Sequence, residues 1–339
     1  MTADNKICFD RILPRDTNRP QRTINLGDGP ASAVFLFRKM WINGSTLRVR
    51  FIGGTSEQIA IAKQQAQWWS EHANLTFDFS DDVDAEIRVS FHPNDGAWSY
   101  IGTDATDIPS NQATMNLGFL SGGTAAHEFG HAIGLAHEHQ NPDGGIQWNE
   151  AVVIRDLGGP PNNWPEEQAR HNVLNKYSAD QIRGTQFDPD SIMLYFFPDS
   201  WVVNGSGTKA NEVLSDQDSA FIASAQAYPG RSNSDITELS ETNNQATVAQ
   251  IGVAGEEDLF KFVVTSDGPR TIETDGQTDV VMKLFGPDSN TRLIAEDDDG
   301  GQGFNSRIVA DLMPGEYYVQ IRHYNSNQGT GEYSIRVSA

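Results

Sequence analysis

One stretch constrains this chain more than any other, because it holds three histidines and a glutamate at fixed spacings. It reads Ala126-His127-Glu128-Phe129-Gly130-His131-Ala132-Ile133-Gly134-Leu135-Ala136-His137-Glu138. On a helix, His127 and His131 project from one face, so both imidazoles can bind one metal ion. Gly134 lets the chain leave the helix with a positive φ, so that His137 can approach the same ion. The spacing therefore predicts a metal site with three imidazole ligands.

Zinc suits three imidazoles, and catalytic zinc sites leave a fourth position to water. The ion lowers the pKa of that water from about 15.7 to roughly 7. Glu128 lies within reach of such a water, so it can act as the general base and return the proton to a leaving amine. A purely structural zinc site favours four protein ligands and needs no carboxylate beside an open position. These residues therefore predict a hydrolytic zinc centre.

Composition limits the other classes of function. The 339 residues carry 24 Lys+Arg against 46 Asp+Glu, a net charge of -22 that repels nucleic acid and anionic membranes. No apolar run approaches 18 residues, so we expect no membrane insertion. The first residues lack the apolar core of a secretory signal, which is either absent or precedes this chain. We therefore expect that the chain binds no nucleic acid. We also expect the protein to be a monomer.

Cys8 is the only cysteine, so no internal disulfide can form. Two interpretations of its side chain stay open. It is either a small, half-buried apolar group or a thiolate that reaches the open zinc position from an N-terminal segment.

Hydrophobic periodicity organises the first two thirds of the chain. Residues 1–45 show no sustained period and are interpreted as a leader or prosegment. Strands are expected at 46–52, 75–79, 86–91 and 113–119, and helices at 55–73, 149–157 and 165–177. If the strand at 113–119 lies at a sheet edge beside the cleft, an extended peptide can pair with it.

A second motif, Asp190-Ser191-Ile192-Met193-Leu194-Tyr195, follows the histidines. Together the two motifs resemble the metzincin zinc proteases, in which this segment is the methionine turn. Because Glu138 follows the third histidine and a tyrosine stands two places after Met193, the chain is most similar to the astacin family. The resemblance spans roughly residues 46 to 229. It implies an α+β catalytic domain of two subdomains, with a twisted mixed sheet and a zinc helix.

The same resemblance implies two further roles. Met193 is expected to form an apolar floor beneath the three histidines. Tyr195 is expected to bind zinc at rest and to hydrogen-bond the oxyanion once substrate is bound, a role that suits a phenol. The chain departs from astacins in having no disulfide and no recognisable aspartate switch in its leader. Some bacterial relatives place a prosegment cysteine on zinc instead, which strengthens the zinc-latch interpretation of Cys8 but leaves both interpretations open.

The pattern changes at about residue 231 to short alternating strands, which predict an all-β sandwich at 231–339. This region resembles the pre-peptidase C-terminal domain of secreted bacterial proteases, in stretches such as Pro314-Gly315-Glu316-Tyr317-Tyr318. Its clustered acidic and amide side chains are candidate calcium ligands, or else a solvated acidic turn. The candidates are Asp297, Asp298, Asp299 and Asn305.

We therefore expect a leader at 1–45, a zinc protease domain at 46–230 and an acidic β-sandwich at 231–339. The expected activity is zinc-dependent hydrolysis of peptide bonds in protein or peptide substrates. We expect the protein to be secreted. The alternative is a zinc-stabilised secreted binding or adhesion protein with a non-catalytic metal site. Glu128 argues against that alternative, because a non-catalytic site needs no general base.

Overall fold

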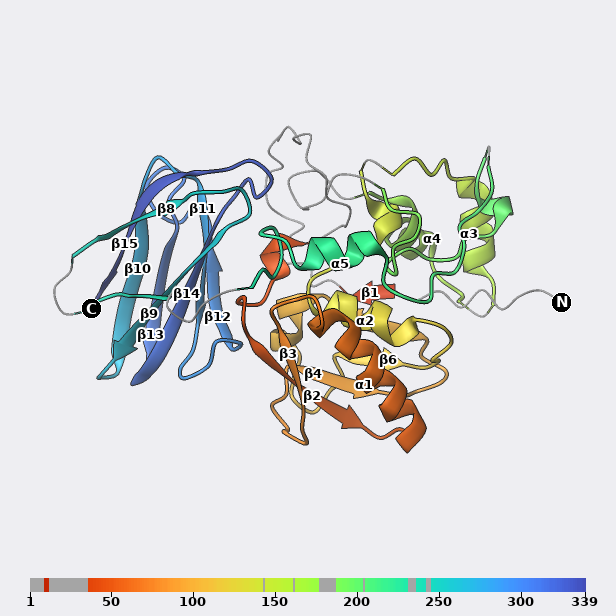
Figure 1. Cartoon of the computed structure of the whole chain (residues 1–339), viewed down its shortest axis with the longest axis horizontal. Coiled ribbons are helices and arrows are strands. Elements are labelled where there is room, and N and C mark those ends of the chain that lie inside the picture. The colour runs from red at the N-terminus through yellow and green to blue at the C-terminus, as the bar shows by residue number, and fades with distance from the viewer. Residues whose placement is uncertain are drawn as a thin grey trace. The chain divides into compact units, whose positions relative to one another are not determined.

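The computed structural model describes residues 9–11, 36–142, 144–160, 162–176, 187–203, 205–230, 236–241 and 245–339. The chain forms two compact units (Figure 1). The first comprises Met1–Met40, Leu47–Ala73 and Phe77–Ile222, and the second comprises Trp41–Thr46, Asn74–Thr76 and Ala223–Ala339. The domain boundaries that we placed at 45/46 and 230/231 stay predictions.

A six-stranded mixed sheet with the order β1-β5-β6-β4-β2-β3 forms one layer of the first unit. Its strands are β1 (Phe9–Arg11), β2 (Thr46–Ile52), β3 (Thr76–Phe79), β4 (Ile87–Ser90), β5 (Ala97–Tyr100) and β6 (Met115–Leu117). Strands β2, β4 and β6 run parallel to one another, and β5 returns antiparallel to β6. The strand expected at 113–119 is therefore interior, because β5 covers its outer side. Strand β1 pairs in parallel with β5 and forms the edge.

Two packed helices support the metal-binding stretch. Helix α1 (Ser56–Ser70) begins with the capping box of Thr55 and Gln58. The Nε1–H of Trp69 in α1 donates to the carbonyl oxygen of Ala126 at 2.7 Å. Gln65 of α1 accepts the Ala126 N–H at 3.0 Å and donates to the Gly122 carbonyl at 2.7 Å. Helix α1 thus satisfies backbone groups at the start of α2 (Thr124–Ala132) and fixes its position.

The second subdomain of this unit contains α3 (Glu150–Gly158), α4 (Glu166–Ala169) and a π-helical turn over Arg170–Leu174. The continuous helix expected at 165–177 is therefore shorter and less regular. Helix α5 (Asp216–Ile222) closes the unit. Among the described residues, 3-10 turns lie at Phe37–Lys39, Gly102–Asp107, Glu138–Gln140 and Asp199–Trp201. An apolar cluster that includes Leu157, Val173, Phe197 and Trp201 forms the core here.

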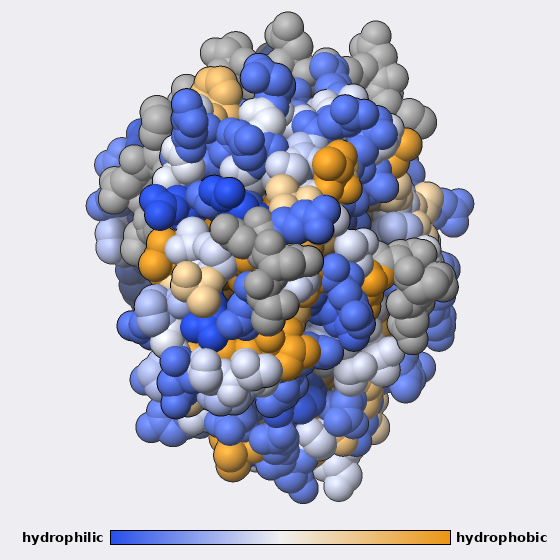
Figure 2. All heavy atoms as spheres, turned by 90° about the vertical axis from the view of Figure 1, so that its left-hand side faces the viewer, coloured by the Kyte–Doolittle hydropathy of each residue, from blue (hydrophilic) through white to orange (hydrophobic). Residues whose placement is uncertain are grey.

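The second unit is the expected β-sandwich. One sheet has the order β13-β10-β15-β8 and the other β12-β11-β14-β9-β7. The strands are β7 (Ile236–Glu238), β8 (Thr247–Ile251), β9 (Glu257–Val264), β10 (Gly268–Gly276), β11 (Val280–Phe285), β12 (Leu293–Asp297), β13 (Arg307–Leu312), β14 (Gly315–His323) and β15 (Gly331–Ser338). Side chains from both sheets, such as Phe262, Ile272, Val319 and Ile335, share one core. The face shown in Figure 2 is mostly hydrophilic, as the charge of -22 leads us to expect.

Segments outside the sandwich belong to the second unit as well. The Gln320 amide donates to the Trp41 carbonyl at 3.1 Å, and the Asn43 N–H donates to Glu257 at 3.2 Å. Glu257 also pairs with Arg322 at 2.7 Å, with both side chains 4% exposed. Residues 41–45, which we interpreted as part of the leader, therefore pack within the β-sandwich unit.

Candidate metal centre and active site

Helix α2 and the turn after it bring three histidines together. His127 and His131 lie one turn apart on α2 and are buried. Gly134 has a φ of 111°, in the left-handed region that glycine adopts without strain, as the sequence predicted. The Leu135 N–H donates to the Gly130 carbonyl at 3.0 Å, which turns the chain so that His137 reaches the same place.

The histidine side chains converge through their Nε2 atoms. The His131 Nε2 lies 3.1 Å from the Nε2 of His127 and 3.0 Å from that of His137. Within the part of the chain that the structure describes, these three residues are the group of His, Cys, Asp or Glu side chains that could hold a metal ion.

Backbone carbonyls determine which nitrogen of two of these rings carries the proton. The Nδ1 of His127 lies 2.8 Å from the Ile192 oxygen, and the Nδ1 of His131 lies 2.7 Å from the Leu135 oxygen. Since a carbonyl oxygen only accepts, both Nδ1 atoms carry the hydrogen, and the two facing Nε2 atoms carry lone pairs. Two lone pairs at 3.1 Å repel each other unless a cation lies between them. The donor set thus fits a zinc ion.

Burial favours the neutral ligand form of all three histidines. Desolvation lowers the pKa of His127 to about 4. Desolvation, with smaller contributions from the neighbouring histidines, also places the pKa values of His131 and His137 well below 6.5. At neutral pH the imidazoles are therefore uncharged and ready to bind metal.

Two predicted catalytic residues lie at this cluster. Glu128 follows His127 on α2 and is fully buried. The Tyr195 hydroxyl forms a hydrogen bond with the Nε2 of His137, and the Tyr195 ring centroid lies 4.3 Å from that of His137. A phenol is thus held at the ligand atom of the third histidine.

Met193 packs against the metal helix at Gly130, and its role as a floor beneath the three histidines stays a prediction. A Cβ atom added to Gly130 on α2 would lie 2.5 Å from the Met193 sulfur, so a side chain at this helix position would require its neighbours to shift. The Met193 carbonyl oxygen accepts the N–H of Glu138 at 3.0 Å. The turn around Met193 therefore contacts both α2 and the segment that carries His137.

Three buried carboxylates around this turn were missed as a group by sequence reasoning. Glu138 accepts the Asp188 N–H at 3.0 Å and the Asn141 amide at 3.1 Å, and burial raises its pKa to about 8. Burial also raises the pKa of Asp218 to about 6. The Ser215 hydroxyl donates to Asp188 at 2.6 Å. The only signal in the sequence was the capping pattern of Ser215 and Asp218, which does not reveal these long-range contacts.

The remaining site predictions have different outcomes. Cys8 lies outside the described residues. Asp297 accepts the N–H groups of Gly300 and Arg307, both at 2.8 Å, so its carboxylate organises its own loop. The metal-binding group among the described residues contains none of Asp297, Asp298 or Asp299. Calcium is therefore not supported.

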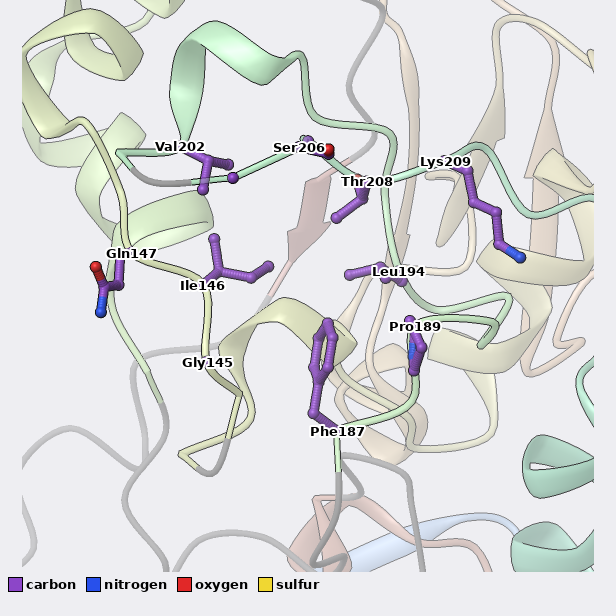
Figure 3. Close-up of a pocket in the computed structure, with 12 residues that line it drawn as sticks. Gly145, Ile146, Gln147, Phe187, Pro189, Leu194, Val202, Ser206, Thr208 and Lys209 are labelled. Carbon is purple, nitrogen blue, oxygen red and sulfur yellow. The ribbon is translucent and has the colours of Figure 1, made fainter.

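A cavity of about 670 Å³ lies next to the segment that carries Tyr195. Its lining includes Ile146, Phe187, Leu194, Val202 and Thr208, which point into it from several segments (Figure 3). The Thr208 hydroxyl donates to the Tyr195 carbonyl and accepts the Phe197 N–H, so it is already paired. The wall of the cavity is thus mainly apolar.

No helix among the described residues is long and apolar enough to cross a membrane.

Comparison with known families supports the sequence resemblance. Residues 38–202 match the family model for astacin, a family of peptidases. Tolloid-like protein 1 of Mus musculus is 29% identical over 168 residues, which are 49% of this chain and 15% of that protein. Zinc metalloproteinase nas-28 of Caenorhabditis elegans is 30% identical over 152 residues, which are 45% of this chain and 28% of that protein. The chain thus spans only a minor part of these relatives.

Two solved structures are similar to different parts of this chain. A structure of myroilysin is 38% identical with a TM-score of 0.54, over 56% of this chain and 96% of that one. The pre-peptidase C-terminal domain of a collagenase from Bacillus anthracis is 19% identical with a TM-score of 0.26, over 30% of this chain and 92% of that one.

Proposed function

Because the chain belongs to the astacin family through residues 38–202, we propose that it is a zinc-dependent endopeptidase acting on proteins or peptides. The observation that carries this proposal is the convergence of three imidazole Nε2 atoms at 3.0–3.1 Å, two of them fixed as lone-pair donors by backbone carbonyls. Such a ligand set needs a cation, and three protein ligands leave a position open for chemistry.

We assign the protein's contributions as follows. A zinc ion bound by His127, His131 and His137 would supply a water of lowered pKa and polarise the substrate carbonyl. Glu128 takes the proton of the attacking water and delivers it to the leaving amine. The Tyr195 hydroxyl leaves His137 and donates a hydrogen bond to the developing oxyanion. Met193 supports the histidines through its contact with α2.

The cavity beside Tyr195 supports a preference for apolar substrate side chains. Its volume of about 670 Å³ falls within the range of about 300–1,000 Å³ that is usual for ligand pockets. Leu194 lines this cavity and directly precedes Tyr195. We propose that a substrate bound at the histidines places a large apolar side chain here.

The leader is proposed to cover the site. Strand β1 already occupies the outer side of β5, and Cys8 directly precedes β1 in the sequence. We propose that Cys8 binds the open zinc position in this covered form. We also propose that the protein is secreted and monomeric. The proposal of secretion rests on the resemblance of the C-terminal region to domains of secreted proteases.

The first experiment compares casein hydrolysis by the full chain and by a chain lacking residues 1–35. The deletion removes strand β1 from the sheet edge but ends before Leu36, whose N–H donates to the Gly134 carbonyl at 2.9 Å. We expect the shortened chain to be the more active form. A chelator should abolish its activity, and added zinc should restore it. Cys8→Ala in the full chain should release part of this activity if the latch exists.

Two outcomes would count against these proposals. Equal activity of the full and shortened chains would reject the covering role of the leader. A shortened chain that binds zinc yet hydrolyses no protein substrate would reject the peptidase and favour the binding or adhesion protein.

A further inference from the structure

Asp218 joins helix α5 to the turn that carries Met193. It is 1% exposed. Its Oδ1 accepts the hydroxyl of Ser191 at 2.7 Å, and its Oδ2 accepts the N–H of Ile192 at 2.8 Å. Both partners are 26 or 27 residues away in the sequence, so this carboxylate holds a remote segment.

That segment in turn holds the metal-binding residues. The Ile192 carbonyl oxygen accepts the Nδ1–H of His127 at 2.8 Å. The Ser191 hydroxyl accepts the N–H of Met193 at 3.0 Å, and the Met193 carbonyl accepts the N–H of Glu138 at 3.0 Å. Residues 191–193 thus lie between Asp218 on one side and the histidine cluster on the other.

A local structural role explains only part of these contacts. Ser215 and Asp218 form a reciprocal pair at the start of α5, with the Asp218 N–H donating to the Ser215 hydroxyl and the Ser215 N–H donating to Asp218, both at 2.9 Å. This pair alone satisfies the helix start. The bonds from Ser191 and Ile192 serve no group of α5, so they need another explanation.

We infer that Asp218 is a positioning residue for the metal site, acting through Ile192 on His127. By fixing the backbone of Ile192, it holds the carbonyl that keeps the proton on Nδ1 and leaves the Nε2 lone pair for the metal. The opposite tautomer of His127 has a hydrogen on Nε2 and cannot bind the metal ion through that atom. This inference deepens the proposed function and rests on it for the identity of the metal as zinc.

The size of the expected loss in metal affinity follows from the effect of comparable supporting contacts in other metal sites. Removing a group that orients a metal ligand typically weakens metal binding by about 10–100-fold. Asp218→Asn keeps the shape of the side chain but replaces one acceptor oxygen with a donor, which then faces the Ile192 N–H or the Ser191 hydroxyl. We expect zinc affinity to fall by about 10–100-fold in this variant.

The experiment uses the full chain and two readouts besides activity. Competition with a chelator of known affinity gives the zinc dissociation constant. The ¹⁵N chemical shifts of the His127 ring, in zinc-free protein labelled at histidine, give its tautomer. Ser215→Ala is the control, because it removes the hydroxyl that accepts the Asp218 N–H and donates to Asp188 but leaves the Ser191 and Ile192 contacts in place. Asp216→Asn removes an exposed carboxylate from the same helix.

We expect Asp218→Asn to weaken zinc binding and to bring the Nε2–H tautomer of His127 into the population, whereas both controls bind zinc as the unmodified chain does. Urea unfolding of each variant separates this effect from stability. The inference is overturned if Asp218→Asn keeps the zinc affinity and the tautomer of His127. It is also overturned if Ser215→Ala loses as much zinc affinity as Asp218→Asn at an equal loss of stability.

If Asp218→Asn fails to fold, Ser191→Ala is the second variant, because it keeps Asp218 but removes the hydroxyl that donates to it and accepts the Met193 N–H. It should weaken zinc binding in the same direction, and unchanged binding would reject the inference. Neither readout requires peptide hydrolysis. A chain that binds zinc without hydrolysing peptides would therefore reject the proposed function and leave this test intact.

Discussion

At the scale of single residues, removing the Tyr195 hydroxyl is a simple test of the mechanism. It bonds to the Nε2 of His137, and phenylalanine would keep the ring and its packing. Loss of one oxyanion donor typically costs about 10²–10³ in kcat. We therefore expect Tyr195→Phe to lower kcat by about 10²–10³-fold with the zinc content unchanged. An unchanged kcat would show that the phenol takes no part in the reaction.

Buried histidines make stability depend on pH with a defined sign. Desolvation lowers the pKa of His127 to about 4 and of His139 to about 3, and the pKa values of His131 and His137 are lowered too. As pH falls below 6.5, the unfolded chain binds these protons first, so stability is lost. Two buried acids act in the opposite direction, because burial raises the pKa of Glu138 to about 8 and of Asp218 to about 6.

Four histidines against two acids give a net loss of stability on acidification. Zinc binding adds to this loss of stability, because the histidines must be neutral to bind zinc and acid protonates them. Between about pH 6 and pH 5 we expect the free energy of unfolding to fall by roughly 1–3 kcal/mol. Urea unfolding of the zinc-loaded chain at several pH values measures this change. A free energy that stays level or rises with acidification over this range would contradict the prediction.

At the scale of elements, α2 depends on a glycine at position 130. A methyl group there would lie 2.5 Å from the Met193 sulfur and 3.0 Å from Trp69. Overpacking of this kind costs about 1–3 kcal/mol. We expect Gly130→Ala to lower the free energy of unfolding by about 1–3 kcal/mol and to weaken zinc binding.

Gly145→Ala is the control for this prediction, because a Cβ at Gly145 would meet nothing within 4 Å. Urea unfolding and zinc titration of both variants provide the measurement. Equal stability and zinc affinity in the two variants would mean that Met193 moves aside without cost.

The elements of this fold differ in how far the sequence predicts them. The zinc helix, the turn at Gly134 and the alternating strands of the β-sandwich follow from periodicity and local backbone preference. The pairing of β1 with β5 does not, because strand order depends on contacts between segments far apart. For the same reason, the contacts of Asp218 with Ser191 and Ile192 could not be predicted from the sequence.

At the scale of the whole molecule, a buried ion pair ties an early segment into the β-sandwich unit. Glu257 pairs with Arg322 at 2.7 Å and also accepts the N–H of Asn43. Removing one partner of a buried pair costs about 3–5 kcal/mol, because the other charge stays buried. We expect Glu257→Ala to destabilise the second unit by about 3–5 kcal/mol in calorimetric unfolding.

The more exposed pair of Glu273 and Arg336 offers a control. Such pairs are worth about 0–1 kcal/mol, so Glu273→Ala should have little effect. If the two variants unfold alike, the contact of residues 41–43 with the sandwich is not important for stability.

The central claim is that Glu128 works as the general base beside a zinc ion held by three histidines. The most direct test measures zinc content and casein hydrolysis on the same preparations of the chain lacking residues 1–35, with Glu128 or with Glu128→Gln. Glu71→Gln, at an exposed position, is the control. We predict one zinc ion per chain in all forms and a loss of about 10²–10⁴-fold in kcat only for Glu128→Gln. Undiminished hydrolysis by Glu128→Gln, or a chain that binds no zinc, would contradict the account.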